Sequence, residues 1–368
     1  MKKHTDRDIS ARSGSPNPNR VETAEGGGRP SSTNPAPSPG GRSKGGSGKR
    51  PGVTLAATVL NEAGTVVEWW RSILCQTRLP DEVVVVDGGS WDGTVERLRE
   101  LALEAPFPVR VDILPGSNIA RGRNRAVSLA SHDVIAVTDA GCVLDPGWLE
   151  NLTAPLDEDP GLDLVAGFYQ PLARSWFEAL CASVTLPLPQ EVRGERFMPS
   201  SRSLAFRREV WERVGGYPEW LDIGEDMYFN HRWRELGIRH AFRPEAVVYW
   251  RMRPDLPSFL RQYFRYARGD GESGMYPHRH LLRFAVYGGL TWAAVSRAGR
   301  RFFPLALLPA CLYAGRRWRR IPAFLRDRSP AEKAAAAAAV PLLLAGVDVA
   351  KMAGYLHGLW RRRSGGQV

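Results

Sequence analysis

Between residues 53 and 138 the sequence alternates short apolar runs with segments of helical periodicity. The apolar runs, each predicted to be a strand, are Val53–Leu60, Glu82–Val86, Val109–Leu114 and Val134–Thr138. The segments predicted to be helices are Glu62–Gln76, Thr94–Glu104 and Ile119–Ala130. Strands and helices that alternate at this spacing are typical of βαβ units, in which helices cover both faces of a parallel sheet. The predicted fold class is therefore α/β.

Polar residues follow three of the predicted strands. Asn61 and Glu62 come after the first strand, Asp87 after the second and Asp139 after the fourth. In open α/β sheets, ligands bind outside the carboxyl ends of the strands. We therefore expect these side chains at a ligand-binding site.

The two ends of the chain depart from this pattern. Residues 1–50 are rich in Ser, Pro, Gly and Asn and have no apolar period, which predicts a disordered leader. No apolar stretch follows Lys2 and Lys3, so we expect no secretory signal peptide. After Arg279, residues 284–296, 302–315 and 334–347 form uncharged, largely apolar stretches of 13 to 14 residues. A membrane span needs roughly 20 residues, so interfacial, re-entrant or marginally spanning helices and an ordinary helical subdomain are all open.

Composition and charge narrow the possible functions. Of the 368 residues, 43% are hydrophobic, so most of the chain can form a core. The four cysteines are widely spaced, which excludes a zinc ribbon and a disulfide scaffold. The net charge of +11 comes from the ends, because residues 1–50 and 315–368 carry +6 and +8 while residues 51–314 carry −3. Basic ends around an acidic middle argue against nucleic acid as a partner and suit contact with anionic lipid. The alternative is that the arginines serve solubility.

The segment after the second strand is a candidate for chemistry. Asp87 is followed by the turn Gly88-Gly89-Ser90-Trp91-Asp92-Gly93-Thr94. Glycines let the backbone approach a ligand closely, and a carboxylate at a strand end can accept hydrogen bonds from a base or a ribose. A tight turn in which Asp92 or Thr94 caps the next helix explains the same residues equally well. Other motifs decide between the two interpretations.

Six motifs follow one another in an order that resembles the family 2 glycosyltransferases of the GT-A fold. The motifs are Asn61-Glu62, Asp87 to Thr94, Arg123-Asn124-Arg125-Ala126, the strand ending at Asp139, Gly215-Gly216-Tyr217 before Glu225-Asp226, and Gln262-Tyr263-Phe264-Arg265-Tyr266. The resemblance covers about residues 53–268. It implies a GT-A type nucleotide-binding fold, with a mostly parallel sheet between helices, and direct displacement with inversion of the anomeric centre.

The resemblance also implies roles for individual residues. Asp226 and Glu225 are the catalytic carboxylates, with Asp226 as the general base that takes the proton of the acceptor hydroxyl. Asp139 is the metal ligand near the leaving diphosphate. The residues expected to bind the nucleotide sugar are Asn61, Glu62, Asp87, Arg123, Asp139, Gln262, Arg265 and Tyr266.

One departure from the family concerns the metal. The Asp-x-Asp motif is Asp139-Ala140-Gly141 here, so the second acidic residue is absent. Positive charge at the diphosphate can come from Mg²⁺ or Mn²⁺ held through Asp139, or from arginines, among which Arg123 and Arg265 are our candidates. Asp145 either replaces the missing carboxylate or forms a turn with Pro146.

These observations lead to one main functional hypothesis and two alternatives. The main hypothesis is an inverting glycosyltransferase that uses a nucleotide-sugar donor and a lipid-linked or polysaccharide acceptor at the cytoplasmic face of the membrane. The alternatives are a non-catalytic module that binds sugar nucleotides or membranes, and a nucleotidyltransferase. Residues 1–50 are assigned to the leader, 51–275 to the GT-A domain and 276–368 to a membrane-associated helical region. Residues 200–203, Ser-Ser-Arg-Ser, either face the acceptor or form a plain loop.

Overall fold

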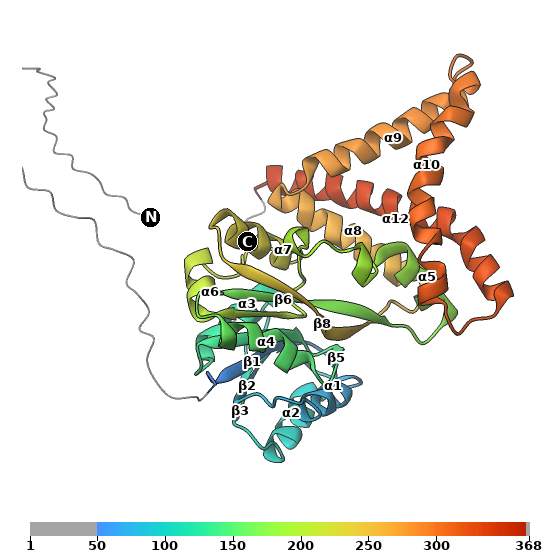
Figure 1. Ribbon diagram of the computed structural model, residues 1–368. Coiled ribbons are helices and arrows are strands. Elements are labelled where there is room, and N and C mark those ends of the chain that lie inside the picture. The colour runs from blue at the N-terminus through green and yellow to red at the C-terminus, as the bar shows by residue number, and fades with distance from the viewer. Residues whose placement is uncertain (1–49, 366–368) are drawn as a thin grey trace, which may run out of the picture. The chain divides into compact units, whose positions relative to one another are not determined.

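The computed structural model describes residues 50–365, so the predicted leader, apart from Arg50, lies outside the described residues. Its centre is one eight-stranded sheet with the strand order β3-β2-β1-β4-β7-β6-β8-β5 (Figure 1). The strands are β1 (Val53–Val59), β2 (Glu82–Asp87), β3 (Val109–Ile113), β4 (Val134–Asp139), β5 (Cys142–Leu144), β6 (Leu164–Leu172), β7 (Leu204–Arg207) and β8 (His240–Arg251).

The sheet has two halves of different construction. β3, β2, β1 and β4 are all parallel, as predicted, and form the parallel half. β7 runs antiparallel to β4 and to β6, β8 runs parallel to β6, and β5 runs antiparallel to β8. We call β7, β6, β8 and β5 the mixed half. The predicted α/β class is confirmed.

Helices cover both faces of the sheet. The helices of the first part are α1 (Val66–Leu74), α2 (Thr94–Leu103), α3 (Ile119–Leu129), α4 (Trp148–Glu158), α5 (Trp176–Thr185), α6 (Arg208–Val214) and α7 (Glu225–Glu235). Successive residues of a strand point to opposite faces. In β2, accordingly, Val83 and Val85 join a core with Trp69 of α1, while Val84 and Val86 join a second core that includes residues of α3, α6 and α7.

The first helix is shorter than predicted. It begins at Val66 instead of Glu62, because the chain turns at Asn61, with a φ of 56°, and Thr65, with a φ of −127°, is not helical. The backbone N–H of Glu62 then donates to Thr94 Oγ1 at 2.8 Å. Residues 61–65 therefore form a loop at the carboxyl end of β1.

Five helices follow in the chain, and all of them except α9 contribute, together with α5, to a third core. They are α8 (Leu256–Ser273), α9 (Pro277–Val295), α10 (Phe303–Trp318), α11 (Ile321–Phe324) and α12 (Pro330–Arg363). α12 packs along α8 so closely that a Cβ at Gly354 would lie 2.1 Å from the carbonyl oxygen of Phe264. α9 and α10 extend away from the sheet (Figure 1). The predicted apolar stretches thus lie mainly in α9, α10 and α12, and the boundary at residue 275 stays a prediction.

α12 is, among the described residues, the helix whose length and composition would allow it to cross a membrane. Its most apolar window has a mean hydropathy of 1.6, and 33% of that window is buried against the rest of the protein. Core helices of soluble proteins pass the same criterion, so this property alone is weak support for a membrane span.

Candidate active site

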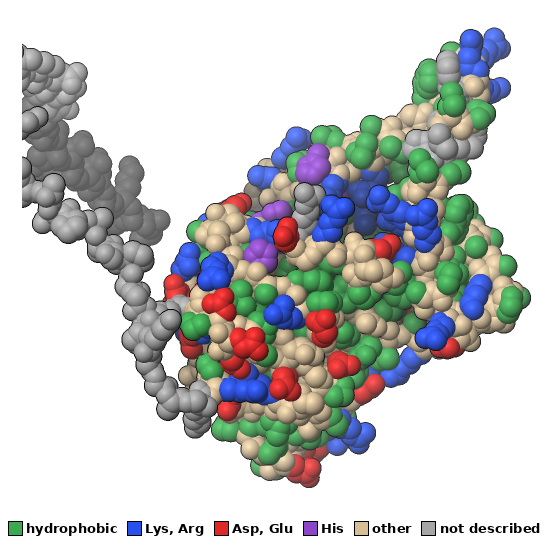
Figure 2. Space-filling view, in the orientation of Figure 1, with side chains coloured by type: hydrophobic (Ala, Val, Ile, Leu, Met, Phe, Trp, Pro, Cys, Tyr) green, Lys and Arg blue, Asp and Glu red, His purple; other side chains and the backbone are tan. Residues whose placement is uncertain are grey.

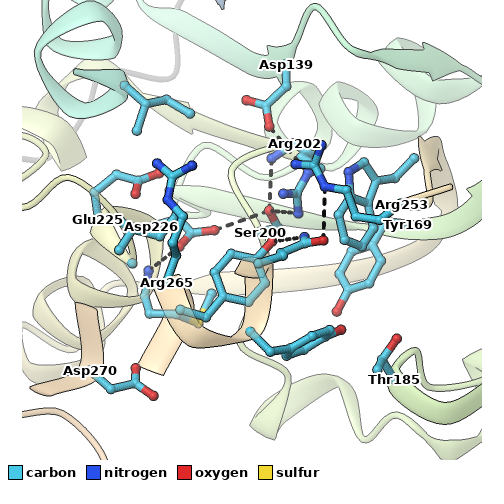
Figure 3. A pocket seen from close by; sticks show the side chains of 18 of the residues that line it. Asp139, Tyr169, Thr185, Ser200, Arg202, Glu225, Asp226, Arg253, Arg265 and Asp270 are labelled. Atoms are coloured by element: carbon cyan, nitrogen blue, oxygen red, sulfur yellow. Dashed lines mark hydrogen bonds and ion pairs between the residues drawn. The ribbon is translucent and has the colours of Figure 1, made fainter. Parts of the chain in front are cut away.

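Two cavities meet at the carboxyl ends of the central strands. The strand-end cavity, of about 790 Å³, is lined by Thr58 and Val59 of β1, Gly88 after β2, and Glu62. The inner cavity, of about 550 Å³, lies under α7 and α8 and includes Asp226 (Figure 3). The residues that line both cavities, which we call the shared wall, are Ile119, Asp139, Arg202, Ile223, Trp250, Arg253 and Arg265. A ligand that spans both cavities must pass this wall.

Arg123 is the buried centre of the ionic network beneath the wall. Its Nη1 lies 2.5 Å from Glu225 Oε1, and its Nη2 lies 2.6 Å from Asp139 Oδ1. The residue is only 2% exposed. Burial lowers the pKa of Arg123, but Asp139 and Glu225 raise it more, so its pKa lies above the ordinary value. Because both terminal nitrogens bind carboxylates, we infer that Arg123 positions these groups; its predicted contact with the donor stays a prediction.

The two carboxylates at the start of α7 face different surroundings. Glu225 is buried against Arg123, and burial, together with the neighbouring Asp226, raises the pKa of Glu225 to about 7. Asp226 lines the inner cavity, where its Oδ2 accepts a hydrogen bond from Ser200 Oγ at 3.2 Å (Figure 3). Its Oδ1 accepts from the backbone N–H of Met227 at 2.8 Å. Both residues line the inner cavity, but Glu225 is buried whereas Asp226 is partly exposed.

Arg202 lines both cavities and belongs to the segment 200–203, to which the sequence analysis assigned no individual role. Its Nε lies 3.3 Å from Asp139 Oδ2, and its guanidinium carbon lies 4.4 Å from the centre of the Trp250 ring. Its Nη1 donates to Ser200 Oγ at 3.0 Å. The loop of residues 198–203 that carries it is therefore part of the site, whereas the sequence had left open whether residues 200–203 form a plain loop.

The motif after β2 forms a closely bonded turn. Asp87 is fully buried and accepts hydrogen bonds from the backbone N–H groups of Gly89 and Ser90, both at 2.8 Å. Asn61 Oδ1 accepts from Trp91 N at 3.1 Å, and Thr94 Oγ1 donates to Asp92 Oδ1 at 2.5 Å. Gly88 lines the strand-end cavity, while the side chains of Asn61 and Asp87 are engaged with the turn. Their role in donor binding stays a prediction.

The predicted residues of α8 lie in the inner cavity. Gln262 donates from Nε2 to the hydroxyl of Tyr266 at 2.6 Å, and its Oε1 accepts from Arg253 Nε at 3.2 Å. Arg265 belongs to the shared wall. The motif therefore brings an arginine to the same two cavities as Asp139, from a helix more than 120 residues further along the chain.

The residues near Asp139 do not suit a metal ion. Both carboxylate oxygens of Asp139 already face guanidiniums, those of Arg123 and Arg202. Burial raises the pKa of Asp139, but these two cations lower it more, so its pKa lies below the usual range. Within residues 50–365, no group of three or more His, Cys, Asp or Glu side chains is arranged to hold a metal ion. Asp145 forms a turn, since its Oδ1 accepts from Gly147 N at 3.1 Å, and it lines neither cavity.

Comparisons with known proteins agree on one family. Residues 54–211 match the family described as Glycosyl transferase family 2, and residues 134–347, more than half of the chain, match Glycosyl transferase family group 2. Glycosyltransferase AglE of Haloferax volcanii is 27% identical over 252 residues, which cover 67% of this chain and 81% of that protein. The succinoglycan biosynthesis protein ExoA of Rhizobium meliloti is 29% identical over 265 residues, covering 68% and 73%.

A solved structure is similar over most of the chain. It is the mannosyltransferase PcManGT from Pyrobaculum calidifontis in complex with GDP-Man and Mn²⁺, with a TM-score of 0.50 and 22% sequence identity. The match covers 86% of this chain and 88% of that protein. At this level of identity the likeness concerns the fold, and it agrees with the GT-A type fold expected from the motifs.

Proposed function

The chain belongs to glycosyl transferase family 2 and is a glycosyltransferase, and from that premise we propose that it is an inverting enzyme with Asp226 as its general base. The donor is a nucleoside diphosphate sugar that lies across the shared wall, with the nucleotide in the strand-end cavity. The acceptor hydroxyl enters the inner cavity beside Asp226. One observation carries this proposal, namely that Asp226 shares the inner cavity with the guanidiniums of the wall.

The chemistry follows from this placement. The acceptor oxygen attacks the anomeric carbon while the carboxylate of Asp226 takes the hydroxyl proton. The bond from the anomeric carbon to the phosphate oxygen breaks, and its electron pair leaves with the nucleoside diphosphate. Since attack and departure occur on opposite sides of the carbon, a single displacement inverts the configuration. Positively charged groups near the departing oxygen stabilise the charge that develops there.

Relatives suggest the class of acceptor. An O-antigen chain rhamnosyltransferase of Salmonella typhimurium is 29% identical over 209 residues, and ExoA is named for succinoglycan biosynthesis. Both names refer to surface polysaccharides. We infer for this chain a lipid-linked or polysaccharide acceptor, and a place at the cytoplasmic face of the membrane, where nucleotide sugars are available.

The helices α9 and α10 support the membrane part of this proposal. Hydrophobic and basic side chains gather on them (Figure 2). Leu281, Leu282 and Trp292 of α9 are 65%, 65% and 55% exposed, and Leu312 of α10 is 68% exposed. Exposed apolar side chains beside arginines are typical of helices that lie in a lipid interface. Binding to vesicles that contain anionic lipid, compared with neutral vesicles, tests this inference.

Replacement of the base tests the catalytic proposal. Asp226→Asn keeps the shape of the side chain but cannot take a proton, so we expect kcat to fall about 10³-fold while the affinity for the nucleoside diphosphate stays nearly unchanged. Glu235→Gln, an exposed carboxylate near the end of the same helix, is the matched control. The anomeric configuration of the product, measured by NMR, tests inversion. Full turnover by Asp226→Asn, or a product of retained configuration, would refute the mechanism.

A further inference from the structure

The wall shared by the two cavities carries a net positive charge. Its charged residues are three arginines, Arg202, Arg253 and Arg265, and one carboxylate, Asp139. A donor whose nucleotide lies in one cavity and whose sugar lies in the other places its diphosphate against this wall. We propose that Arg202 binds the leaving diphosphate and supplies there the charge for which related folds use a metal ion. This inference rests on the proposed function.

Arg202 is held in a defined orientation. Asp139 contacts its Nε at 3.3 Å, Ser200 accepts from its Nη1 at 3.0 Å, and the Trp250 ring lies 4.4 Å below the guanidinium carbon. These contacts engage Nε, Nη1 and one face of the planar group. Its Nη2 forms no hydrogen bond with the described residues. A planar guanidinium held in this way offers its free N–H groups to phosphate oxygens in a rigid, often bidentate geometry.

Arg202 keeps its positive charge in this position. Burial lowers the pKa of Arg202, but Tyr266 and Asp139 raise it more, so its pKa lies above the ordinary value of an arginine. A side chain that is 20% exposed loses part of its hydration, which strengthens its attraction for an anion. Arg202 therefore combines a permanent charge with partial burial at the wall.

Position 141 supplies no carboxylate to a metal ion, because it is a glycine. A Cβ built on Gly141 would lie 3.3 Å from Glu62 Oε1, so an acidic side chain at this position would bring a second carboxylate against Glu62. Asp139, the first residue of the motif, is already neutralised by Arg123 and Arg202. A metal ion would therefore have to be held through Glu62. The competing explanation is that such an ion, and not Arg202, stabilises the leaving diphosphate.

Ser200 forms hydrogen bonds with both Arg202 and Asp226. Its Oγ accepts from Arg202 Nη1 at 3.0 Å and donates to Asp226 Oδ2 at 3.2 Å. As the acceptor oxygen bonds to the anomeric carbon, its proton moves to Asp226. The bond between that carbon and the phosphate oxygen breaks, and the phosphate oxygen keeps the electron pair near Arg202. The loop of residues 198–203 therefore sets the spacing between the group that takes the proton and the group that stabilises the leaving oxygen.

Calorimetric titration with UDP and GDP, in EDTA or in MnCl₂, tests the proposal without requiring turnover. We expect the wild-type chain to bind one of these diphosphates with the same affinity, within about twofold, in both buffers. Arg202→Ala should bind it at least about tenfold more weakly and lower kcat about 10² to 10³-fold. Guanidinium chloride at millimolar concentration should restore part of the activity of Arg202→Ala, because it can occupy the vacated space beside Trp250. Arg232→Gln, an exposed arginine on α7, is the control for loss of a positive charge.

Several outcomes would overturn the inference. It fails if EDTA abolishes binding or transfer and Mn²⁺ restores it, and Glu62→Gln then shows whether Glu62 holds the ion. It also fails if Arg202→Ala binds the diphosphate as tightly as the wild type, or if the wild type binds neither UDP nor GDP. If Arg202-dependent binding is observed but no nucleotide sugar supports transfer, the proposed function fails and the assignment of Arg202 to the diphosphate stands.

Discussion

The two halves of the sheet use their polar residues in different ways. In the parallel half, the residues that follow the strands bond to one another, as Asp87 does with Gly89 and Ser90. In the mixed half, the residues that line the cavities include Trp250 of β8 and, in the loop before β7, Ser200 and Arg202. The first arrangement builds a rigid turn that presents backbone to the strand-end cavity. The second leaves polar side chains available to a ligand.

This difference suggests that substitutions in the two halves affect different properties of the protein. Substitutions in the parallel half should mainly change the stability of the protein and the shape of the strand-end cavity. Substitutions in the mixed half should mainly change the rate of the reaction. Arg123 lies between the halves, because it joins Asp139 of β4 to Glu225 of α7.

Loss of the link between the halves should have the largest effect. Arg123→Met keeps much of the side-chain volume but leaves the buried Glu225 and the adjoining Asp139 without their shared cation. Breaking a buried ion pair from one side costs about 3 to 5 kcal/mol, so urea unfolding should show a loss of that size. Arg97→Met, at an exposed position on α2, is the control. If Arg123→Met were as stable as the wild type, the link would contribute nothing to the fold.

The turn of the parallel half provides the next test. Asp87→Ala removes the acceptor of two backbone N–H groups and of Ser90 Oγ. Hydrogen bonds to a buried carboxylate make such a loss worth about 2 to 3 kcal/mol in the free energy of unfolding. The affinity for the nucleoside diphosphate should fall as well, since Gly88 would lose its support. Glu100→Ala, an exposed carboxylate on α2, should stay within about 0.5 kcal/mol of the wild type. Unchanged stability of Asp87→Ala would remove the distinction between the halves.

A pH titration tests Glu225, which is buried although it lines the inner cavity beside the residues of the mixed half. Glu225 belongs to α7 but is buried, and burial raises its pKa from 4.5 to about 7. Between these pH values the folded chain holds a proton that the unfolded chain has released. The stabilisation is therefore complete below pH 4.5 and is lost as the pH rises through about 7, with a total on the order of 3 kcal/mol.

Comparison with Glu225→Gln isolates this effect. The variant cannot ionise at position 225, so its urea midpoint should lack the component of the pH slope between pH 5 and 8 that Glu225 gives the wild type. Parallel profiles for the two proteins would mean that the contact with Arg123 keeps Glu225 ionised throughout this range.

The parallel half was largely predictable from the sequence. β1, β2 and β4 are largely apolar runs, because both faces are buried, and Val83 to Val86 show this most clearly. The start of α1 was predicted wrongly, since the positive φ of Asn61 depends on contacts with the turn after β2. Local patterns thus specified elements, whereas contacts between loops decided where one of them begins.

The residues of the site were predictable only in part. Asp226 and Arg265 were found because they belong to motifs with a known order. Arg202 was named only within the segment 200–203 and given no role of its own, because its place beside Asp139 depends on the antiparallel pairing of β7 with β4, in which Val134 faces Arg207. The partnership of Arg123 with Glu225 joins residues 102 positions apart, which no local pattern indicates. The serines at 200, 201 and 203 around Arg202 were the available signal, since small polar residues close to an arginine suit a polar cavity.

The smallest effect is expected for Ser200→Ala, which should change the rate of the reaction without changing the stability of the protein. Ser200→Ala removes the hydroxyl between Arg202 and Asp226 but leaves both charged groups in place. Stability should stay within about 0.5 kcal/mol of the wild type, because the hydroxyl borders a cavity that water can enter. The value of kcat should fall about tenfold, which corresponds to about 1.4 kcal/mol in the barrier, because Asp226 and Arg202 lose their common partner. Ser200→Thr restores the hydroxyl and should recover most of the rate. A loss of stability as large as that of Asp87→Ala, with kcat unchanged, would mean that the 198–203 loop is built like the turn after β2 and that the two halves do not differ.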